Sequence, residues 1–134
     1  MAKKIEIESD LNNVRIVEKA IDEVTSDMGI SQENYGKILV STLEAVNNAI
    51  LHGNNSNPEK IVSVAITYSS QNLKIKVRDE GQGFKPEEVP DPTTPANIES
   101  LNGRGVYLMS KLADKIEYSK KGNTVTMTFK IIKS

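Results

Sequence analysis

Apolar and polar residues alternate along several short stretches of the chain. In one of them, Leu73, Ile75 and Val77 are separated by lysines. Because successive side chains of a strand point to opposite faces of a sheet, this alternation predicts a strand with one face in contact with water. The same reasoning predicts strands over residues 4–8, 61–68, 73–77, 115–118 and 125–132.

Between the first two strands, apolar residues recur at intervals of three and four, which is the period of an amphipathic helix. Ser9 or Asp10 caps the first predicted helix, and Gly29 ends it. Ser31 caps the second helix, and Gly53 ends that one. The chain therefore begins with a strand followed by two long helices.

A third, shorter helix is predicted over residues 106–112. Before it, residues 85–102 hold four of the five prolines and few apolar residues. A loop this long in a compact domain is more often functional than incidental. We find no repeat or internal boundary, so a single domain is expected over residues 1–134. Strands joined by tight turns predict an α+β fold, a two-layer sandwich of a mixed, largely antiparallel sheet with helices on one face.

Composition excludes several classes of protein. Of the 134 residues, 37% are hydrophobic and 26% are charged, which suits a folded core and argues against disorder. The formal net charge of −1 leaves no basic surplus for binding nucleic acid, and without cysteine there are no disulfides or thiolate metal sites. With neither a signal peptide nor a membrane-spanning apolar run, a cytoplasmic protein without membrane contact is expected.

The second predicted helix carries a stripe of polar residues. Glu44, Asn48 and His52 are spaced four apart and therefore share one side of the helix. Such a stripe is typical of the solvent face of an amphipathic helix. However, the adjacent pair Asn47 and Asn48 is unfavourable in mid-helix, which indicates a requirement other than helix stability. A carboxylate and an amide oxygen one turn apart could serve as a base and a Mg²⁺ ligand.

A second candidate motif, with the sequence DEGQGF, occupies residues 79–84 directly after a predicted strand. Plain turns commonly have this composition. The motif lacks the third glycine of a dinucleotide fingerprint, and the chain contains no GxxxxGK[ST] phosphate loop. A carboxylate at the end of a strand could nevertheless accept a hydrogen bond from an exocyclic amine, with glycines allowing close approach.

The third motif, with the sequence NGRGVYLM, opens the third predicted helix at residues 102–109. Glycines also occur in ordinary helix caps. However, backbone N–H groups at the start of a helix bind anions, and the guanidinium of Arg104 suits a phosphate.

In this order and spacing, the three motifs resemble the N, G1 and G2 boxes of the ATPase superfamily that includes gyrase, heat-shock chaperones, histidine kinases and mismatch-repair proteins. Within it, the chain is most similar to the anti-sigma-factor serine kinases that control bacterial sigma factors. The resemblance extends from the first helix to the last strand and implies a histidine kinase-like ATP-binding fold. The matching residues are 43–45, 48–49 and 52–53 within the N box (residues 43–53), 79, 81, 83 and 84 within G1 (residues 79–84), 91–92 for the lid and 103–109 for G2.

The resemblance also implies ATP and Mg²⁺ as cofactors and assigns roles to residues. Glu44 would be catalytic, orienting and deprotonating the serine hydroxyl of a protein substrate, and Asn48 would ligate Mg²⁺. Asp79 would accept a hydrogen bond from the adenine amino group, and residues 85–102 would form a lid. The implied ATP-binding residues are Asn48, Asp79, Gly81, Gly83, Phe84, Gly103, Arg104, Gly105, Val106 and Thr124.

One position departs from the superfamily pattern. A threonine often follows the glycine that precedes the last strand, where it helps to hold adenine. Here Gly122 is followed by Asn123, and Thr124 comes one position later. The asparagine amide can also donate and accept hydrogen bonds.

In the family that the chain resembles, the substrate is an anti-anti-sigma protein with a STAS domain, which competes with a sigma factor for a usually homodimeric kinase. The expected function is an ATP-binding anti-sigma factor and serine/threonine kinase in bacterial partner switching. The alternative is a nucleotide-gated binding protein with little or no kinase activity. A histidine kinase fragment is disfavoured because the only histidine, His52, closes the N box. A gyrase-like ATPase is disfavoured because no second domain follows the last predicted strand.

Overall fold

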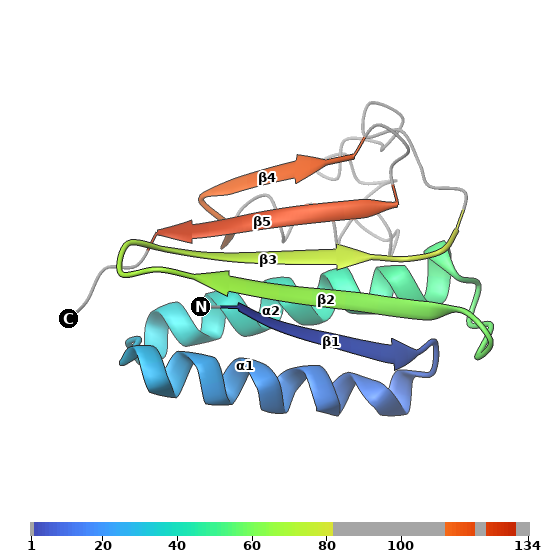
Figure 1. Cartoon of the computed structure of the whole chain (residues 1–134), viewed down its shortest axis with the longest axis horizontal. Helices are drawn as coiled ribbons and strands as arrows, with labels where there is room; N and C mark the ends of the chain where they lie inside the picture. Colours follow the sequence, from blue (N-terminus) through green and yellow to red (C-terminus); the bar gives the residue numbers. More distant parts are fainter. Residues whose placement is uncertain (1, 82–111, 120–122, 131–134) are drawn as a thin grey trace, which may run out of the picture.

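The computed structural model describes residues 2–81, 112–119 and 123–130. Figure 1 shows one sheet with two long helices packed against one of its faces. In chain order the elements are β1 (Ala2–Glu8), the 3₁₀-helix η1 (Leu11–Asn13), α1 (Val14–Met28), α2 (Gln32–Asn48), the π-helix η2 (Ala49–Gly53), β2 (Ile61–Tyr68), β3 (Asn72–Arg78), β4 (Lys115–Tyr118) and β5 (Thr124–Lys130).

The five strands form a single sheet in the order β1-β2-β3-β5-β4. Each adjacent pair within the described residues is antiparallel. On β3, Leu73, Ile75 and Val77 are buried while Lys74 and Lys76 between them are exposed, as the alternation predicts. The predicted two-layer α+β sandwich is confirmed, and its sheet is antiparallel throughout the described part.

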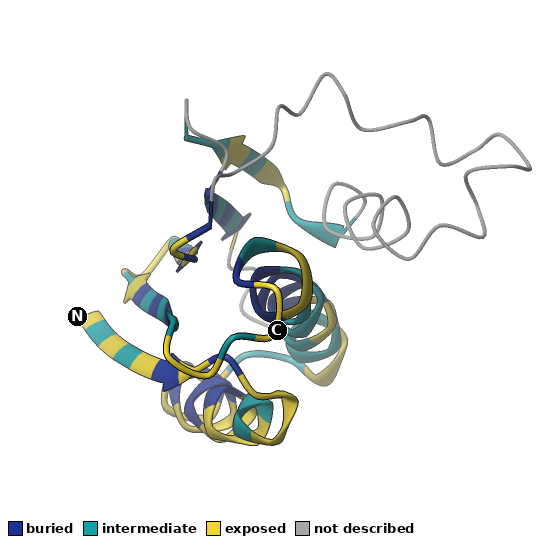
Figure 2. Ribbon diagram, turned by 90° about the vertical axis from the view of Figure 1, so that its right-hand side faces the viewer, coloured by how far each residue is buried: buried dark blue, intermediate teal, exposed yellow. Residues whose placement is uncertain are grey.

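Apolar side chains from the two helices and the inner face of the sheet form one core. Val17 and Ile21 of α1, Val46 of α2, and Val64 and Ile75 of the sheet are all completely buried. Figure 2 shows the buried residues gathered between the sheet and the two helices. Full burial of one such side chain contributes about 1.5–3 kcal/mol, so this layer supplies the main stabilisation of the fold.

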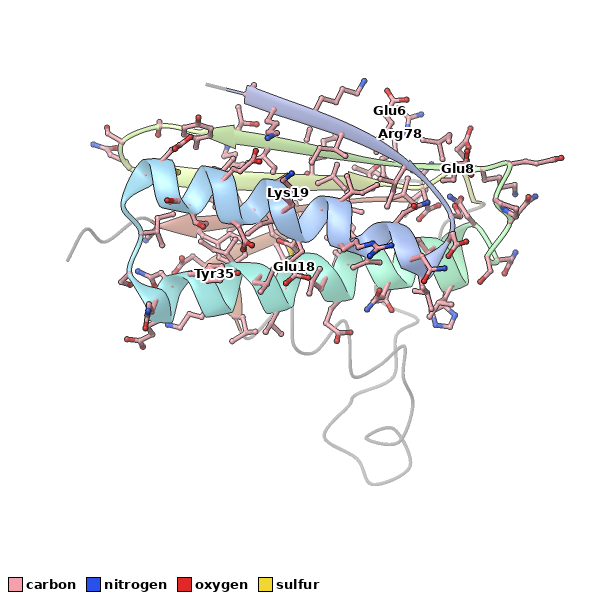
Figure 3. All side chains as sticks on the ribbon, turned by 90° about the horizontal axis from the view of Figure 1, so that it is seen from below. Glu6, Glu8, Glu18, Lys19, Tyr35 and Arg78 are labelled. Atoms are coloured by element: carbon pink, nitrogen blue, oxygen red, sulfur yellow. The ribbon has the colours of Figure 1, made fainter. Side chains whose placement is uncertain are left out.

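The opposite face of the sheet carries charged and small polar side chains. Glu6 on β1 and Arg78 on β3 both align with Ser63 of β2, so the three lie on this face (Figure 3). In the helical layer, the phenol of Tyr35 on α2 donates a hydrogen bond to the carboxylate of Asp22 on α1. The core therefore lies between the helices and the inner face of the sheet, and the outer face of the sheet is polar.

The helix ends follow the predicted caps. The side chain of Asp10 accepts a hydrogen bond from a backbone N–H of η1, which leads directly into α1. Ser9 is instead buried and is not the cap. Gly29 ends α1 in the left-handed conformation with φ 67°, and the side chain of Ser31 caps α2. The predicted loop over residues 85–102 lies outside the described residues. Of the predicted helix over residues 106–112, only the last residue is described, and it is helical.

Candidate nucleotide site

The helix that carries the polar stripe changes form at its C-terminal end. α2 ends at Asn48 and continues as the π-helix η2, whose closing bond runs from the backbone N–H of Asn54 to the carbonyl of Ala49 at 2.8 Å. The chain then turns sharply at Asn55 and Ser56, which both adopt left-handed backbone conformations with φ values of 52° and 55°. Short π-helical turns inside α-helices are frequent at functional sites, which makes this end of α2 a candidate.

Glu44 and Asn48 are both half-buried on α2, on either side of the buried Ala45 and Val46. The Asn48 side chain makes no capping hydrogen bond to η2. An amide oxygen is a ligand type that Mg²⁺ accepts, since this ion prefers oxygen ligands and is commonly held by one or two protein groups together with substrate phosphates. His52 is exposed, and it lies in the wider π-helical turn, outside the α-helical spacing that predicted a common stripe.

Asp79 lies directly beyond β3 and is 9% exposed. Its Oδ1 accepts a hydrogen bond from the backbone N–H of Gly81 at 2.8 Å, which closes a tight turn. Because the buried inner positions of β3 are Leu73, Ile75 and Val77, Asp79 continues the row that faces the helices. The carboxylate is therefore on the side of the sheet that carries α2 and η2.

Two glycines bring the end of η2 against this carboxylate. A Cβ atom added to Gly53 would lie 2.3 Å from the Cγ of Asp79. A Cβ atom added to Gly81 would lie 2.0 Å from the carbonyl oxygen of Gly53. No real Cβ atom makes contacts this short, so both positions need glycine for the close approach of backbones. The end of the predicted N box thus meets the start of the G1 box at Asp79.

Asn123, directly before β5, holds the backbone of Asp79. Its carbonyl accepts from the Asp79 N–H at 2.9 Å, and its Nδ2 donates to the Asp79 carbonyl at 3.2 Å. Its Oδ1 accepts from the hydroxyls of Ser119 at 3.3 Å and Thr124 at 3.4 Å. Of Asn123 and Thr124, Asn123 is therefore the residue that contacts Asp79 directly. Thr124 pairs with the exposed Arg78, which places it on the sheet face away from the helices.

The described residues thus include Glu44, Asn48, Asp79, Gly81 and Thr124 of the predicted site. Within them, no group of three or more histidine, cysteine or acidic side chains could hold a metal ion. No helix among them is long and apolar enough to cross a membrane. The remaining predicted residues lie outside the described part of the chain, and their roles stay predictions: Gly83, Phe84, Gly103, Arg104, Gly105 and Val106.

Sequence reasoning missed two residues that contribute to this geometry. Gly53 was read only as the end of a helix and of the N box, although it makes the close approach to Asp79 possible. Asn54, which follows it, is completely buried and hydrogen-bonds to the Glu80 N–H next to Asp79. The position of Gly53 directly after the N-box histidine was a signal for its role. Asn54 lies in a turn-rich, polar segment, and nothing in that segment indicated that its side chain is buried.

Comparisons with known proteins show the family of the chain. Residues 7–129 match the family described as the histidine kinase-like ATPase domain. A serine-protein kinase RsbW from Bacillus velezensis is 30% identical over 132 residues, covering 93% of this chain and 82% of the relative. An anti-sigma F factor from Bacillus cytotoxicus is 34% identical over 104 residues, covering 73% of this chain and 70% of the relative.

A solved structure supports the fold. The RsbU and RsbW domains of Rv1364c from Mycobacterium tuberculosis superpose with a TM-score of 0.67 at 17% sequence identity. The match covers 98% of this chain, and this chain spans 32% of the mycobacterial chain. At this identity the likeness establishes the arrangement of helices and strands.

Proposed function

This chain belongs to the histidine kinase-like ATPase domain family, and we propose that it is an ATP-binding anti-sigma factor and serine kinase. Its protein substrate would be an anti-anti-sigma protein with a STAS domain. The observation that carries the proposal is the meeting of the N-box end with the G1 carboxylate, where Gly53 and Gly81 close on Asp79. The names of the relatives, anti-sigma F factor and serine-protein kinase, support the choice within the family.

In the proposed complex, the Asp79 carboxylate accepts a hydrogen bond from the adenine amino group. The hydrogen bonds from Asn123 and Gly81 support this role because they fix the backbone and one carboxylate oxygen of Asp79. Asn48 offers its amide oxygen to Mg²⁺, which neutralises phosphate charge when bound. Arg104 and the backbone N–H groups of residues 103–106 complete the proposed phosphate site.

The proposed catalytic residue is Glu44, one helical turn before Asn48. Its carboxylate orients the substrate serine and accepts the hydroxyl proton. The serine oxygen then forms a bond to the terminal phosphorus as the bond from that phosphorus to the bridging oxygen breaks, leaving ADP. Phosphoryl transfer depends on positioning and charge stabilisation more than on covalent help from the protein, so this small set of residues is sufficient.

The proposed partners follow from the same assignment. The nucleotide-bound protein, as a homodimer, binds a sigma factor, and an unphosphorylated STAS-domain protein competes for it. Phosphorylation of the STAS-domain serine then weakens that competitor.

The test is incubation of the purified chain with Mg²⁺, ATP labelled on its terminal phosphate and a panel of STAS-domain proteins. We expect label on a serine of at least one of them, located by peptide mass spectrometry, and no transfer when Mg²⁺ is chelated. If no panel member accepts phosphate while a sigma factor binds under nucleotide control, the protein is a nucleotide-gated binder and the kinase proposal is wrong.

A further inference from the structure

Asn54 is a buried polar residue for which neither the motif analysis nor the proposed reaction gives a role. It is 0% exposed, and its amide group is fully used. The Nδ2 donates to the hydroxyl of Ser9 at 2.8 Å and to the carbonyl of Ile61 at 3.2 Å. The Oδ1 accepts from the backbone N–H of Glu80 at 2.7 Å. A buried amide with both donors and its acceptor paired is held in one orientation.

The partners of Asn54 come from separate parts of the chain. Ser9 follows β1 and also donates its hydroxyl to the carbonyl of Lys60 just before β2. The backbone N–H of Asn54 closes η2 on Ala49. Asn54 therefore joins the end of the N box, the end of β1, the start of β2 and the residue after Asp79.

The bond to Glu80 fixes the peptide unit that leaves Asp79. Asn54 accepts from the N–H of this peptide, and Asn123 donates to its carbonyl oxygen, which belongs to Asp79. Because a peptide unit is planar, holding both of its polar atoms fixes its rotation. The Asp79 N–H, bonded to the Asn123 carbonyl, holds the preceding peptide unit as well. With both flanking units held, the direction in which the Asp79 side chain leaves the backbone is fixed, and Gly81 holds one carboxylate oxygen.

We propose that Asn54 is a positioning residue for base selection, which aims the Asp79 carboxylate so that it distinguishes an amino group from a carbonyl oxygen on the purine ring. The proposal rests on the proposed function, in which Asp79 accepts from the adenine amine. A carboxylate attracts an N–H donor and repels a carbonyl oxygen, and the strength of both effects depends on its direction.

A purely structural role predicts a different result. Removing the amide would leave the N–H of Glu80 and the hydroxyl of Ser9 without their partner, which lowers stability. Loss of stability alone, however, changes the affinities for all nucleotides by the same factor once the variant is folded. The ratio of affinities for two bases therefore separates positioning from stability.

The experiment compares Mg-ATP with Mg-inosine triphosphate, in which a carbonyl oxygen replaces the amino group. Dissociation constants are measured by calorimetry for wild type and Asn54→Ala at a temperature where circular dichroism shows both folded. We expect wild type to prefer ATP, and we expect the ratio of the two affinities to fall about tenfold or more in Asn54→Ala. The control is Thr25→Ala, which removes a buried hydrogen bond to Ile21 within α1 and is expected to keep the wild-type ratio.

Asp79→Asn in the same assay separates the two proposals. If Asp79→Asn loses the preference and Asn54→Ala keeps it, Asn54 is not a positioning residue and the adenine assignment stands. If wild type shows no preference, or Asp79→Asn keeps it, the adenine assignment fails and the role of Asn54 fails with it.

A measurement on wild type covers the case in which Asn54→Ala does not fold. Because the Glu80 N–H is bonded to Asn54, its hydrogen exchange reports on this link. At saturating nucleotide, we expect the Glu80 amide to exchange more slowly with Mg-ATP than with Mg-inosine triphosphate. Equal exchange with the two nucleotides overturns the proposal.

Discussion

At the scale of single residues, the proposed contact to the adenine base is the Asp79 carboxylate. Asp79→Asn keeps the size of the side chain but replaces a charged acceptor with a neutral amide. We expect ATP binding to weaken by about 1–3 kcal/mol, the usual effect of losing a hydrogen bond to a charged group. Calorimetric titration with Mg-ATP measures this change. An unchanged ATP affinity would contradict the assignment of Asp79 to adenine.

Glu44 is the residue whose change separates transfer from binding. Glu44→Gln keeps the shape of the side chain and loses its basicity, and loss of a general base typically slows a reaction by about 10²–10⁴-fold. We expect Mg-ATP affinity within a few-fold of wild type and phosphate transfer to a STAS-domain substrate at least about 100-fold slower. Calorimetry and a labelled-phosphate assay measure the two quantities. Equal transfer rates for wild type and variant would remove Glu44 from the mechanism.

Asn48 provides the matched control for Glu44, one turn further along α2. If its amide oxygen ligates Mg²⁺, Asn48→Ala lowers metal-dependent nucleotide binding and transfer together. If Asn48→Ala loses both nucleotide binding and transfer while Glu44→Gln loses only transfer, Asn48 is distinguished as the metal ligand and Glu44 as the base.

At the scale of elements, the π-helix η2 brings the N box to Asp79, and it tolerates no side chain at Gly53. Because a Cβ atom there would lie 2.3 Å from the Asp79 Cγ, Gly53→Ala must displace the carboxylate or the end of η2. We expect ATP affinity to fall at least about tenfold, or about 1.4 kcal/mol. Calorimetry on the folded variant checks this.

Gly36, in the preceding helix α2, provides the control for Gly53. Nothing lies within 4 Å of a Cβ added there, and its backbone is helical. Gly36→Ala should therefore raise stability by about 0.5–1 kcal/mol and leave ATP affinity unchanged. If Gly53→Ala also bound ATP as tightly as wild type, the close contact with Asp79 would have no part in binding.

The elements that the sequence predicted are those determined by neighbouring residues. Strand alternation in residues 73–77 and the helix end at Gly29 are local signals, and the structure contains both features. The π-helical end of α2 was not predicted, because the same residues also fit an ordinary α-helix. The hydrogen bonds that Asn54 and Asn123 make to the Asp79 turn were not predicted either. Asn54 lies 26 positions from Glu80, and Asn123 lies 44 positions from Asp79.

At the scale of the whole molecule, the described sheet ends at the short edge strand β4, which pairs with β5. Ile116 on β4 aligns with Met127, and Tyr118 aligns with Val125, so both face the core. The sequence predicted this two-layer arrangement because each element has one apolar side and the layers must cover it.

The partial burial of Tyr118 connects this packing to pH. Burial raises the pKa of the Tyr118 phenol from 10.0 to about 12, because the charged phenolate is poorly solvated there. The folded state therefore holds the phenol proton more tightly than the unfolded chain does. The resulting contribution to stability is fully present below about pH 10 and is lost as the pH rises through the folded pKa.

We therefore expect the free energy of unfolding of wild type to fall between about pH 10 and 12 by more than that of Tyr118→Phe. The phenylalanine variant keeps the ring in the core and has no proton to lose, while every other titrating group is common to both proteins. Urea unfolding followed by circular dichroism across this range measures the difference, and the ultraviolet absorbance of tyrosinate follows the ionisation. Parallel pH curves for the two proteins would show that Tyr118 ionises as easily in the folded protein as in the unfolded chain, and that β4 does not hold its ring against the core.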